Sequence, residues 1–403
     1  MDDIKWLENK ITNNDCSALR LMATSEVKKA QALHKSFLEY KETPLVSLNS
    51  LARDLGLGAI FVKDESKRFG LNAFKVLGGS YAIAKFLAAK LGAKNLTFDE
   101  VIKSREKLGE ISFYTATDGN HGRGVAWAAR VLGHKAYVYM PDGATMSRRD
   151  NIRAEGAVCE IIEGANYDEC VRLAATEAEK SGGVIVQDTA WDGYEEIPGH
   201  IMQGYGTMAL EAATQLENLD KLPTHIFIQA GVGSLAASVL GFFKNYAPEK
   251  CPITTVVEPH AADCLYKSAG SGKIEFVTGS LNTIMAGLSC GEPNPVAWEL
   301  LRSHAAFFAS CPDSVAAEGM RMFASPLGSD EKVVSGESGA VGLGLLVRIM
   351  RDESLKEFKA ALGLDDSSRV LLFSSEGATD VERYLEIVDS ERHAFDVGNR
   401  SHI

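Results

Sequence analysis

Residues 111–144 read ISFYTATDGNHGRGVAWAARVLGHKAYVYMPDGA and carry the clearest sign of the fold class. A run of β-branched and aromatic residues is followed by a turn of glycine and polar residues, by an alanine-rich run with helical spacing, and by a second run of strand type. Parallel strands need such a crossover between them, and the crossover is usually a helix. The stretch therefore predicts an α/β fold.

Several more units of this kind surround it. Runs typical of strands alternate with stretches of helical spacing, which predicts parallel sheets with helices on their faces. We expect residues 88–197 to form a small α/β domain, and residues 1–87 and 198–403 to form a larger one around a second sheet. The strands expected in the small domain are ISFYTA, KAYVYM, AVCEII and GVIV, and those in the large domain include AIFVKDES, HIFIQA, TTVVEP and RVLLFSSEG.

Composition narrows the class of partner. The 42 Lys and Arg residues against 54 Asp and Glu residues give a net charge of −12, and 45% of the chain is hydrophobic. A globular chain with this charge repels nucleic acid and anionic membranes, and no apolar run reaches the roughly 18 residues of a membrane helix. We expect a small-molecule ligand.

The start of the chain and its cysteines bear on the compartment. The first residues, MDDIKWLENK, contain no apolar core of a secretory signal. The seven cysteines are scattered without a Cys-x-x-Cys pair, which favours a reducing, cytoplasmic setting and no metal site. We expect most of them to be small buried side chains, with a pair between Cys264 and Cys290 left open.

Lys75 is the first candidate for chemistry. It lies in FGLNAFKVLGGSYAIAKFL, between a turn and an apolar run expected to be helical. Burial among apolar neighbours would favour the neutral amine that forms a Schiff base. The alternative is a surface lysine at a helix start.

A second candidate segment is DGNHG at residues 118–122, between a predicted strand and a predicted helix. Open α/β sheets bind ligands at such carboxyl ends of strands. Asn120 offers a donor to a ligand oxygen, and Asp118 offers an acceptor or a base. The alternative is a turn whose polar residues only cap the helix.

A third candidate is the loop Gly231–Ser234 in HIFIQAGVGSLAASVL. Backbone N–H groups at a helix start suit a phosphate, although the Lys of a Walker loop is missing. The pattern Gly231, Gly233, Ala236, with Glu258 about 20 residues further on, also matches a dinucleotide fingerprint. A nicotinamide-dependent oxidoreductase is therefore an alternative, although such a fingerprint usually opens its domain.

Two further segments follow predicted strands. Asp188 comes after GVIV and is followed by the acidic residues Asp192, Glu195 and Glu196. The segment FSSEGATD places Ser374, Ser375, Thr379 and Asp380 after the last strand. The histidines show no spacing typical of a catalytic metal site.

In this order, these segments resemble the pyridoxal-phosphate enzymes of fold type II, and within them the diaminopropionate ammonia-lyases. The resemblance covers about residues 42 to 380. Threonine and serine dehydratases usually have Ser-Phe-Lys and a run of glycines where this chain has Ala-Phe-Lys and Gly-Val-Gly-Ser, so a dehydratase is the lesser alternative. The matching segments are GLNAFKVLGGSYA, ATDGNHGRGVAWAA, QDTAWDGYEEIP, QAGVGSLA, AGLSCGEP and SGESGAVG.

The resemblance implies two three-layer domains of parallel sheet, as in the tryptophan synthase β family, with pyridoxal phosphate between them. Lys75 would hold the cofactor covalently and Asn120 would bond its phenolic oxygen. Thr379 would face the pyridine nitrogen with a hydroxyl, which disfavours a strongly stabilised carbanion and favours loss of a β-leaving group. The phosphate would lie on the amides of Gly231, Val232, Gly233 and Ser234, and Gly287 would lie against the ring.

The expected reaction converts D- and L-2,3-diaminopropionate to pyruvate and two molecules of ammonia. Asp118 would take the proton of the D-isomer and Asp188 that of the L-isomer, for which Lys75 is an alternative base. Asp118, Asp188 and Glu195 would also accommodate the second ammonium of the substrate. The resemblance further implies a homodimer. A protein that only carries the cofactor is a remaining alternative, against which the two aspartates argue.

Overall fold

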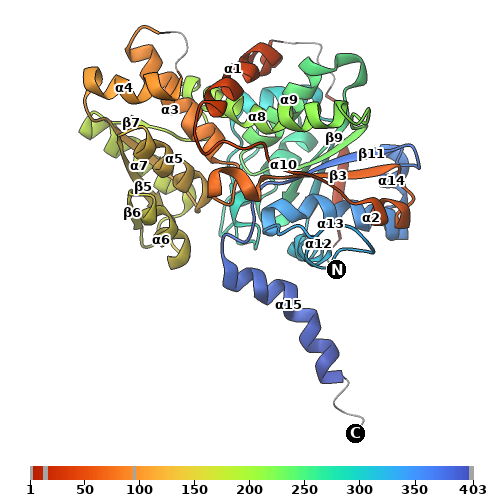
Figure 1. The fold of residues 1–403 in the computed structure, drawn as a ribbon. Helices are drawn as coiled ribbons and strands as arrows, with labels where there is room; N and C mark the ends of the chain where they lie inside the picture. The colour runs from red at the N-terminus through yellow and green to blue at the C-terminus, as the bar shows by residue number, and fades with distance from the viewer. Residues whose placement is uncertain (1–2, 12–16, 94–96, 399–403) are drawn as a thin grey trace.

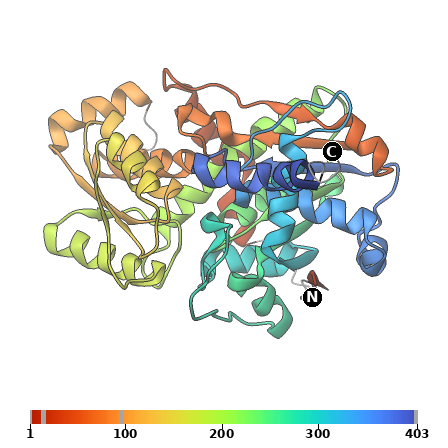
Figure 2. The same ribbon diagram turned by 90° about the horizontal axis from the view of Figure 1, so that it is seen from below.

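The structure is a computed structural model that describes residues 3–11, 17–93 and 97–398, with side chains up to residue 389. Two sheets organise the chain, one of seven strands and one of four. Their units lie side by side in the views of Figures 1 and 2. The predicted α/β class is confirmed.

The smaller sheet contains the four strands predicted in the middle of the chain. All of its pairings are parallel, in the order β6-β5-β4-β7. Alternate residues of β4 point to opposite faces, so that Phe113 joins the core on one side and Ala116 packs with Cys170 and Ala174 on the other. The strands are β4 (Ser112–Ala116), β5 (Lys135–Met140), β6 (Val158–Ile161) and β7 (Val184–Ile185), and the helices between them are α5 (Asn120–Val131), α6 (Met146–Ala154) and α7 (Tyr167–Ser181).

The larger sheet has the order β1-β10-β9-β8-β11-β3-β2. Its five central strands are parallel, as predicted, whereas β1 and β2 at the two edges run antiparallel to their neighbours. The antiparallel edges were not foreseen from the sequence. The strands are β1 (Lys5–Glu8), β2 (Leu45–Ser47), β3 (Ala59–Asp64), β8 (His225–Gln229), β9 (Ile253–Pro259), β10 (Phe307–Cys311) and β11 (Arg369–Ser374).

Helices cover both faces of the larger sheet. In β3, Phe61 faces one apolar cluster while Ile60 and Val62 face another, as the two-residue period of a strand requires. The first face packs on α1 (Thr24–Lys35), α3 (Val76–Lys90), α8 (Glu196–Glu217), α9 (Ser234–Tyr246), α10 (Cys264–Ser271) and α11 (Pro295–His304). The second packs on α2 (Asn49–Asp54), α12 (Asp313–Ala324), α13 (Glu337–Arg351) and α14 (Lys356–Leu362).

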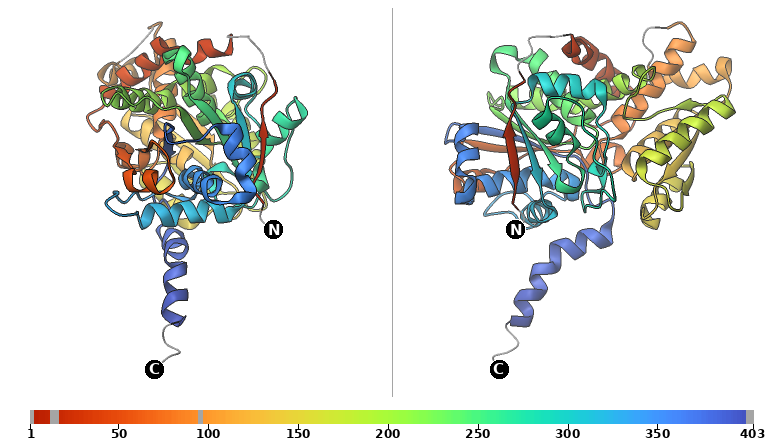
Figure 3. Two further views of the ribbon diagram at one scale, coloured as in Figure 1. Left: turned by 90° about the vertical axis from the view of Figure 1, so that its right-hand side faces the viewer. Right: turned by 180° about the vertical axis from the view of Figure 1, so that it is seen from behind.

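Two helices stand out by their position. Helix α4 (Phe98–Leu108) lies in the polar stretch expected to be a helical connector. Helix α15 (Val381–Gly398) extends away from the rest of the chain (Figures 1 and 3). The division into domains at residues 87 and 197 stays a prediction, because α3 and α8 each run across one of these two boundaries.

The start of α3 is fixed by close packing. A Cβ atom added to Gly124 of α5 would lie 2.8 Å from the backbone nitrogen of Val76, so that only glycine allows the two helices to approach so closely. Before α3, the 3₁₀ segment η2 (Glu65–Gly70) contains Phe69 at φ 49°, and the following turn contains Asn72 at φ 62°. This irregular segment carries Lys75.

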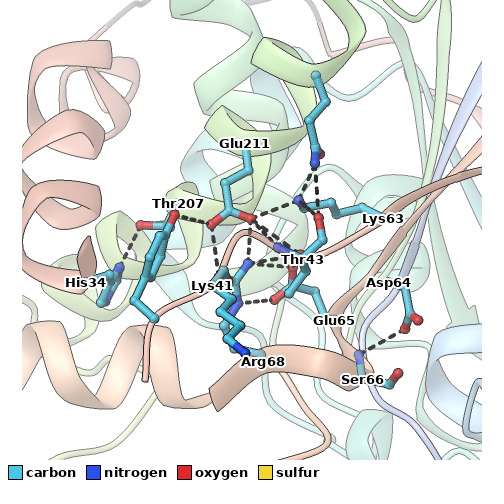
Figure 4. Close-up of polar contacts among 12 residues, drawn as sticks. His34, Lys41, Thr43, Lys63, Asp64, Glu65, Ser66, Arg68, Thr207 and Glu211 are labelled. Atoms are coloured by element: carbon cyan, nitrogen blue, oxygen red, sulfur yellow. Dashed lines mark hydrogen bonds and ion pairs between the residues drawn. The ribbon is translucent and has the colours of Figure 1, made fainter. Parts of the chain in front are cut away.

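A buried network of charged side chains connects η2 to β3 and α8 (Figure 4). Arg68 is fully buried and pairs with Glu65 at 2.8 Å and with Glu211 of α8 at 2.7 Å. Glu211 also pairs with Lys63 of β3 at 2.8 Å. Burial would raise the pKa of Glu211, but the charges of Arg68 and Lys63 lower it to about 2. The segment before Lys75 is therefore tied to β3 and α8 by ionised side chains.

Candidate active site

One cavity at the carboxyl ends of strands from both sheets gathers the residues predicted from the sequence. It is lined by residues that follow β4, β7, β8 and β11, and by the segment before α3. Its lining includes every residue predicted to bind the cofactor or to act as a base, except Thr379. Those residues are Lys75, Asp118, Asn120, Asp188, Gly231, Val232, Gly233, Ser234 and Gly287.

Lys75 is the residue immediately before α3, and its side chain is 18% exposed. The backbone just before it is anchored to the segment after β11. The N–H of Phe74 donates to the carbonyl of Ser375 at 3.1 Å, and the carbonyl of Asn72 accepts from the N–H of Gly377 at 2.9 Å. Lys75 thus lies between an anchored turn and the first residue of α3.

The Lys75 amine contacts the carboxylate of Asp188 in an ion pair. Burial alone would lower the pKa of Lys75, but the charge of Asp188, with Tyr205 and Asp118, raises it above its ordinary value. The contact with Asp188 therefore opposes the neutral amine that was expected from the apolar neighbours in sequence. The apolar residues next to Lys75 did not reveal that a carboxylate distant in sequence contacts it.

Asp188 is the more enclosed of the two aspartates, with a side chain 4% exposed. Burial would raise its pKa, but the charge of Lys75 and the hydrogen bond from its amine lower it below the ordinary value. Its carboxylate also accepts from the Tyr167 hydroxyl at 3.4 Å, and its backbone carbonyl accepts from the Ser234 hydroxyl at 2.6 Å. Asp188 therefore links the lysine to the glycine loop.

His121 contributes a ring nitrogen that sequence reasoning gave no role. Its Nε2 lies 2.9 Å from the carbonyl of Val186, so Nε2 must donate and the neutral ring leaves Nδ1 as an acceptor. Nδ1 has no hydrogen-bond partner among the described residues and lies 3.9 Å from the Asp188 carboxylate. Burial lowers the pKa of His121, so this ring remains neutral.

Asp118 approaches the cavity from the end of β4. Its side chain is 26% exposed and lies 3.8 Å from the Arg148 guanidinium of α6. Burial raises its pKa, with Arg148 and Lys75 opposing the increase. Asp118 thus differs from Asp188, whose pKa is lowered by the contact with Lys75.

The loop Gly231–Ser234 leads from β8 into α9, as predicted. Gly233 has φ +101°, a conformation that favours glycine, and it immediately precedes α9. A Cβ on Gly231 would lie 3.3 Å from the Gly287 carbonyl oxygen, so the two glycine segments are close neighbours. The first N–H groups of a helix have no partner within it, which makes this loop suited to an anion.

The loop after β11 carries the hydroxyl that was expected opposite a pyridine nitrogen. Thr379 does not line the cavity, and its buried hydroxyl has no partner in the part of the chain that the structure describes. Ser375 lines the cavity instead, and its hydroxyl accepts from the side-chain amide of Gln229 at 2.7 Å. The Thr379 contact stays a prediction, and Ser375 is the hydroxyl of that loop that the cavity wall offers.

The acidic residues after Asp188 are exposed. Asp192, Glu195 and Glu196 do not line the cavity, and Glu195 and Glu196 border a separate surface groove beside Pro295. The expectation that Glu195 helps to accommodate a substrate ammonium is therefore wrong. The segment turns into α8 and carries these side chains away from the strand end.

The dinucleotide alternative fails at its acidic residue. Glu258 is fully buried, and its carboxylate accepts from the backbone N–H groups of Leu265 at 2.9 Å and Tyr266 at 2.6 Å. A ribose cannot reach a carboxylate that is already enclosed in this way. The glycine spacing at Gly231 is thus not accompanied by the ribose contact of a dinucleotide site.

The cysteines play no linking part in the described structure. Cys264 and Cys290 are free, and the Cys264 thiol donates to the backbone carbonyl of Cys290 at 3.6 Å. Cys16 lies outside the described residues. The pairing left open by the sequence is absent from the described residues.

Pyridoxal phosphate, implied by the resemblance, fits these residues. A lysine amine reaches the cavity, and a glycine loop before a helix suits the phosphate. The buried hydroxyl of Ser338 lines the cavity without a hydrogen-bond partner among the residues described, and a Cβ on Gly287 would lie 3.0 Å from it. The site thus offers a covalent anchor, an anion cradle and polar groups still to be satisfied.

Comparisons with known proteins give the same assignment. Residues 37–365 match the family model described as pyridoxal-phosphate dependent enzyme. Diaminopropionate ammonia-lyase of Salmonella typhimurium is 50% identical over 386 residues, which cover 94% of this chain and 95% of that protein. Two crystal structures of the Escherichia coli lyase each cover 98% of both chains. The complex with an aminoacrylate-PLP azomethine reaction intermediate has 46% identity and a TM-score of 0.89, and the complex with D-serine has 45% and 0.91.

Proposed function

Because the chain belongs to the family of pyridoxal-phosphate dependent enzymes, we propose that the cavity around Lys75 is its active site. The chain is a carbon–nitrogen lyase that uses pyridoxal phosphate to eliminate ammonia from 2,3-diaminopropionate. In the proposed reaction both the D- and the L-isomer are substrates, one water is consumed, and the products are pyruvate and two molecules of ammonia.

The cofactor would be held by residues from both sheets. Lys75 supplies the amine that binds it covalently, Asn120 donates to its phenolic oxygen, and the loop Gly231–Ser234 receives its phosphate. Gly287 leaves room for the ring because it has no side chain. When bound, pyridoxal phosphate supplies an electron sink for the charge left on the substrate's α-carbon.

One observation carries the assignment of bases. Asp118 and Asp188 reach the same cavity from the ends of different strands, β4 and β7, with Lys75 contacting Asp188. The α-hydrogens of the two substrate isomers point to opposite faces of the cofactor plane, so a single base serves both only if the substrate turns over. We assign Asp118 to the D-isomer and Asp188 to the L-isomer.

The state of Asp188 depends on Lys75. While the lysine is an ammonium ion, its charge lowers the pKa of Asp188 and makes that carboxylate a weak base. When the ammonium charge is gone, burial acts with less opposition and raises the basicity of Asp188. Asp118 needs no such change, since burial already raises its pKa.

Steady-state assays of Asp118→Asn and Asp188→Asn on each isomer test the proposal. We expect Asp118→Asn to lower kcat/KM for the D-isomer by at least about a hundredfold and to spare the L-isomer, and Asp188→Asn to do the reverse. Equal losses on both isomers from either substitution would refute the division. A larger kcat/KM for threonine than for diaminopropionate in the unmodified enzyme would favour the dehydratase alternative.

The remaining predictions concern the setting of the enzyme. The substrate class is an amino acid, as in the D-serine complex of the Escherichia coli lyase. Within the described residues, no helix combines the length and apolar character needed to cross a bilayer. We propose a cytoplasmic homodimer in which the unit of the smaller sheet closes over the substrate.

A further inference from the structure

Glu376 lies where the two sheets meet, and sequence reasoning gave it no role. It follows β11, is 3% exposed and lines the cavity. Its backbone is fixed on both sides, because it pairs with Ala73 in an antiparallel bridge and its carbonyl accepts from the N–H of Gly336 at 2.9 Å. The carboxylate therefore projects from a rigid base.

The two oxygens of this carboxylate serve different parts of the chain. Oε1 accepts from the backbone N–H of Ser338, at the start of α13, at 3.1 Å. Oε2 accepts from the side-chain amide nitrogen of Asn120, at the start of α5. A single buried side chain thus joins a helix of the larger sheet to a helix of the smaller one.

This contact determines how the Asn120 amide is oriented. Both oxygens of Glu376 accept hydrogen bonds, so the Asn120 atom that faces Oε2 is the amide nitrogen and not the oxygen. That nitrogen carries a second hydrogen, which remains available to an acceptor in the cavity.

We propose that Glu376 is a positioning residue that presents the amide nitrogen of Asn120 to the phenolic oxygen of the cofactor. The proposal rests on the proposed function for the role of Asn120. The new element is that the role of Asn120 depends on Glu376, which follows a strand of the larger sheet and lies far from Asn120 in sequence.

Glu376→Gln is the informative variant because it keeps the volume of the side chain. A glutamine has one oxygen and one NH₂ group, whereas both neighbours of Glu376 are donors. If the glutamine oxygen faces Asn120, its NH₂ group faces the N–H of Ser338, and two donors meet. In the reverse orientation, its NH₂ group faces the NH₂ group of Asn120, and two donors meet there. Glu337→Gln is the matched control, since Glu337 is equally buried at 3% exposure, precedes Ser338, and has the Arg383 guanidinium at 3.6 Å instead of Asn120.

The test is a double-mutant cycle on cofactor affinity, with apo-protein titrated with pyridoxal phosphate. We expect Asn120→Ala and Glu376→Gln each to raise Kd about tenfold, and the double variant to raise it no more than about tenfold, because both remove one interaction. Glu337→Gln should leave Kd within about twofold. Kd values that multiply to about a hundredfold in the double variant would overturn the proposal while leaving the role of Asn120 intact.

Two further readouts separate positioning from general loosening of the fold. The absorption spectrum of the bound cofactor should shift in the same direction in Asn120→Ala and Glu376→Gln and stay unchanged in Glu337→Gln. Hydrogen exchange of the apo-protein should rise at the start of α5 in Glu376→Gln, with β8 and β9 unaffected. Unchanged Kd in Asn120→Ala would refute the proposed cofactor contact itself, and the inference with it. Normal Kd and spectrum in Glu376→Gln alone would refute only the inference.

Discussion

Lys63 and Lys75 each pair with a buried carboxylate, but their surroundings differ. Lys63 is fully buried in β3, where its amine donates to the Thr43 carbonyl at 2.7 Å and to Gln215 at 2.9 Å in addition to pairing with Glu211 at 2.8 Å (Figure 4). Lys75 contacts Asp188 and faces a cavity. The Lys63 amine has a partner for each of its three hydrogens. Among the described residues, the Lys75 amine has a hydrogen bond to Asp188 alone.

Their pKa values move in opposite directions. Burial lowers the pKa of Lys63, and the attraction of Glu211 does not restore it because Arg68 shares that carboxylate and repels the lysine. Burial also opposes the charge on Lys75, but Asp188 raises its pKa above the ordinary value. The comparison teaches that the charge of Lys75 is supported mainly by one carboxylate at the cavity, whereas Lys63 shares its carboxylate with Arg68.

The largest expected effect separates the two lysines by activity. Lys75→Ala should lower ammonia release by at least about a thousandfold, because the covalent anchor is lost, while the protein stays folded. Borohydride reduction of the holoenzyme followed by peptide mapping should place the label on Lys75. Label on another lysine would show that Lys75 is not the residue that binds the cofactor covalently.

Breaking the network around Lys63 should act on stability. Glu211→Gln leaves Arg68 and Lys63 buried with less opposite charge, which typically costs about 3–5 kcal/mol in the free energy of unfolding. Chemical denaturation of the apo-protein measures this, with Asp188→Asn at the cavity wall as the control. A loss for Asp188→Asn as large as that for Glu211→Gln would erase the distinction between the two regions.

A buried histidine near this network, His34, gives a smaller, pH-dependent effect. His34 donates from Nε2 to the Leu77 carbonyl at 2.9 Å and accepts from the Thr207 hydroxyl at 2.8 Å, and burial, with the charge of Arg68, lowers its pKa from 6.5 to about 3. Below pH 6.5, His34 binds a proton in the unfolded chain but stays neutral in the folded chain. The stabilising contribution is therefore complete above pH 6.5 and is lost progressively as the pH falls toward 3.

At pH 5 this loss should amount to about 2 kcal/mol relative to pH 7. His34→Gln should show a correspondingly smaller fall between these pH values, measured by urea unfolding of the apo-protein at each pH. A parallel fall in both proteins would mean that His34 does not carry the pH dependence.

The smallest expected effect concerns the reactivity of the lysines. Without the carboxylate of Asp188, burial should lower the pKa of Lys75, so Asp188→Asn should increase its acylation rate in apo-protein about tenfold at pH 8. Peptide mapping after brief treatment with an acylating reagent measures both lysines in one experiment, and Lys63 should stay unlabelled. Slower labelling of Lys75 in the variant would show that Asp188 does not raise the pKa of Lys75.

Sequence reasoning succeeded where signals are local. The period of the strands predicted both sheets, and the turns after β4 and β8 predicted the cavity-lining residues Asp118, Asn120 and Gly231. It failed where two distant residues meet, as with Asp188 and the charge of Lys75. Glu376 stands within a segment singled out for its hydroxyl residues, yet nothing in that segment indicates its contact with Asn120.

The edges of the larger sheet and the buried network show the same limit. Strand β1 is only four residues long and becomes an edge strand by pairing with β10, which lies far away in sequence. Lys63, Arg68 and Glu211 are ordinary charged residues in sequence, and only their meeting inside the protein makes them a core element. Local sequence patterns do not indicate contacts between residues that are far apart in the chain.

The place of β3 in the larger sheet has a consequence for synthesis of the chain. Ala59 pairs with Arg369, so an interior strand made early must wait for β11, which is made almost last. The smaller sheet has all four strands within one continuous stretch, and contacts local in sequence form faster than distant ones. We therefore expect this sheet to form while the chain is still on the ribosome. The apolar surface of β3 then stays exposed until translation is nearly complete, which is the period in which chaperones would act on it.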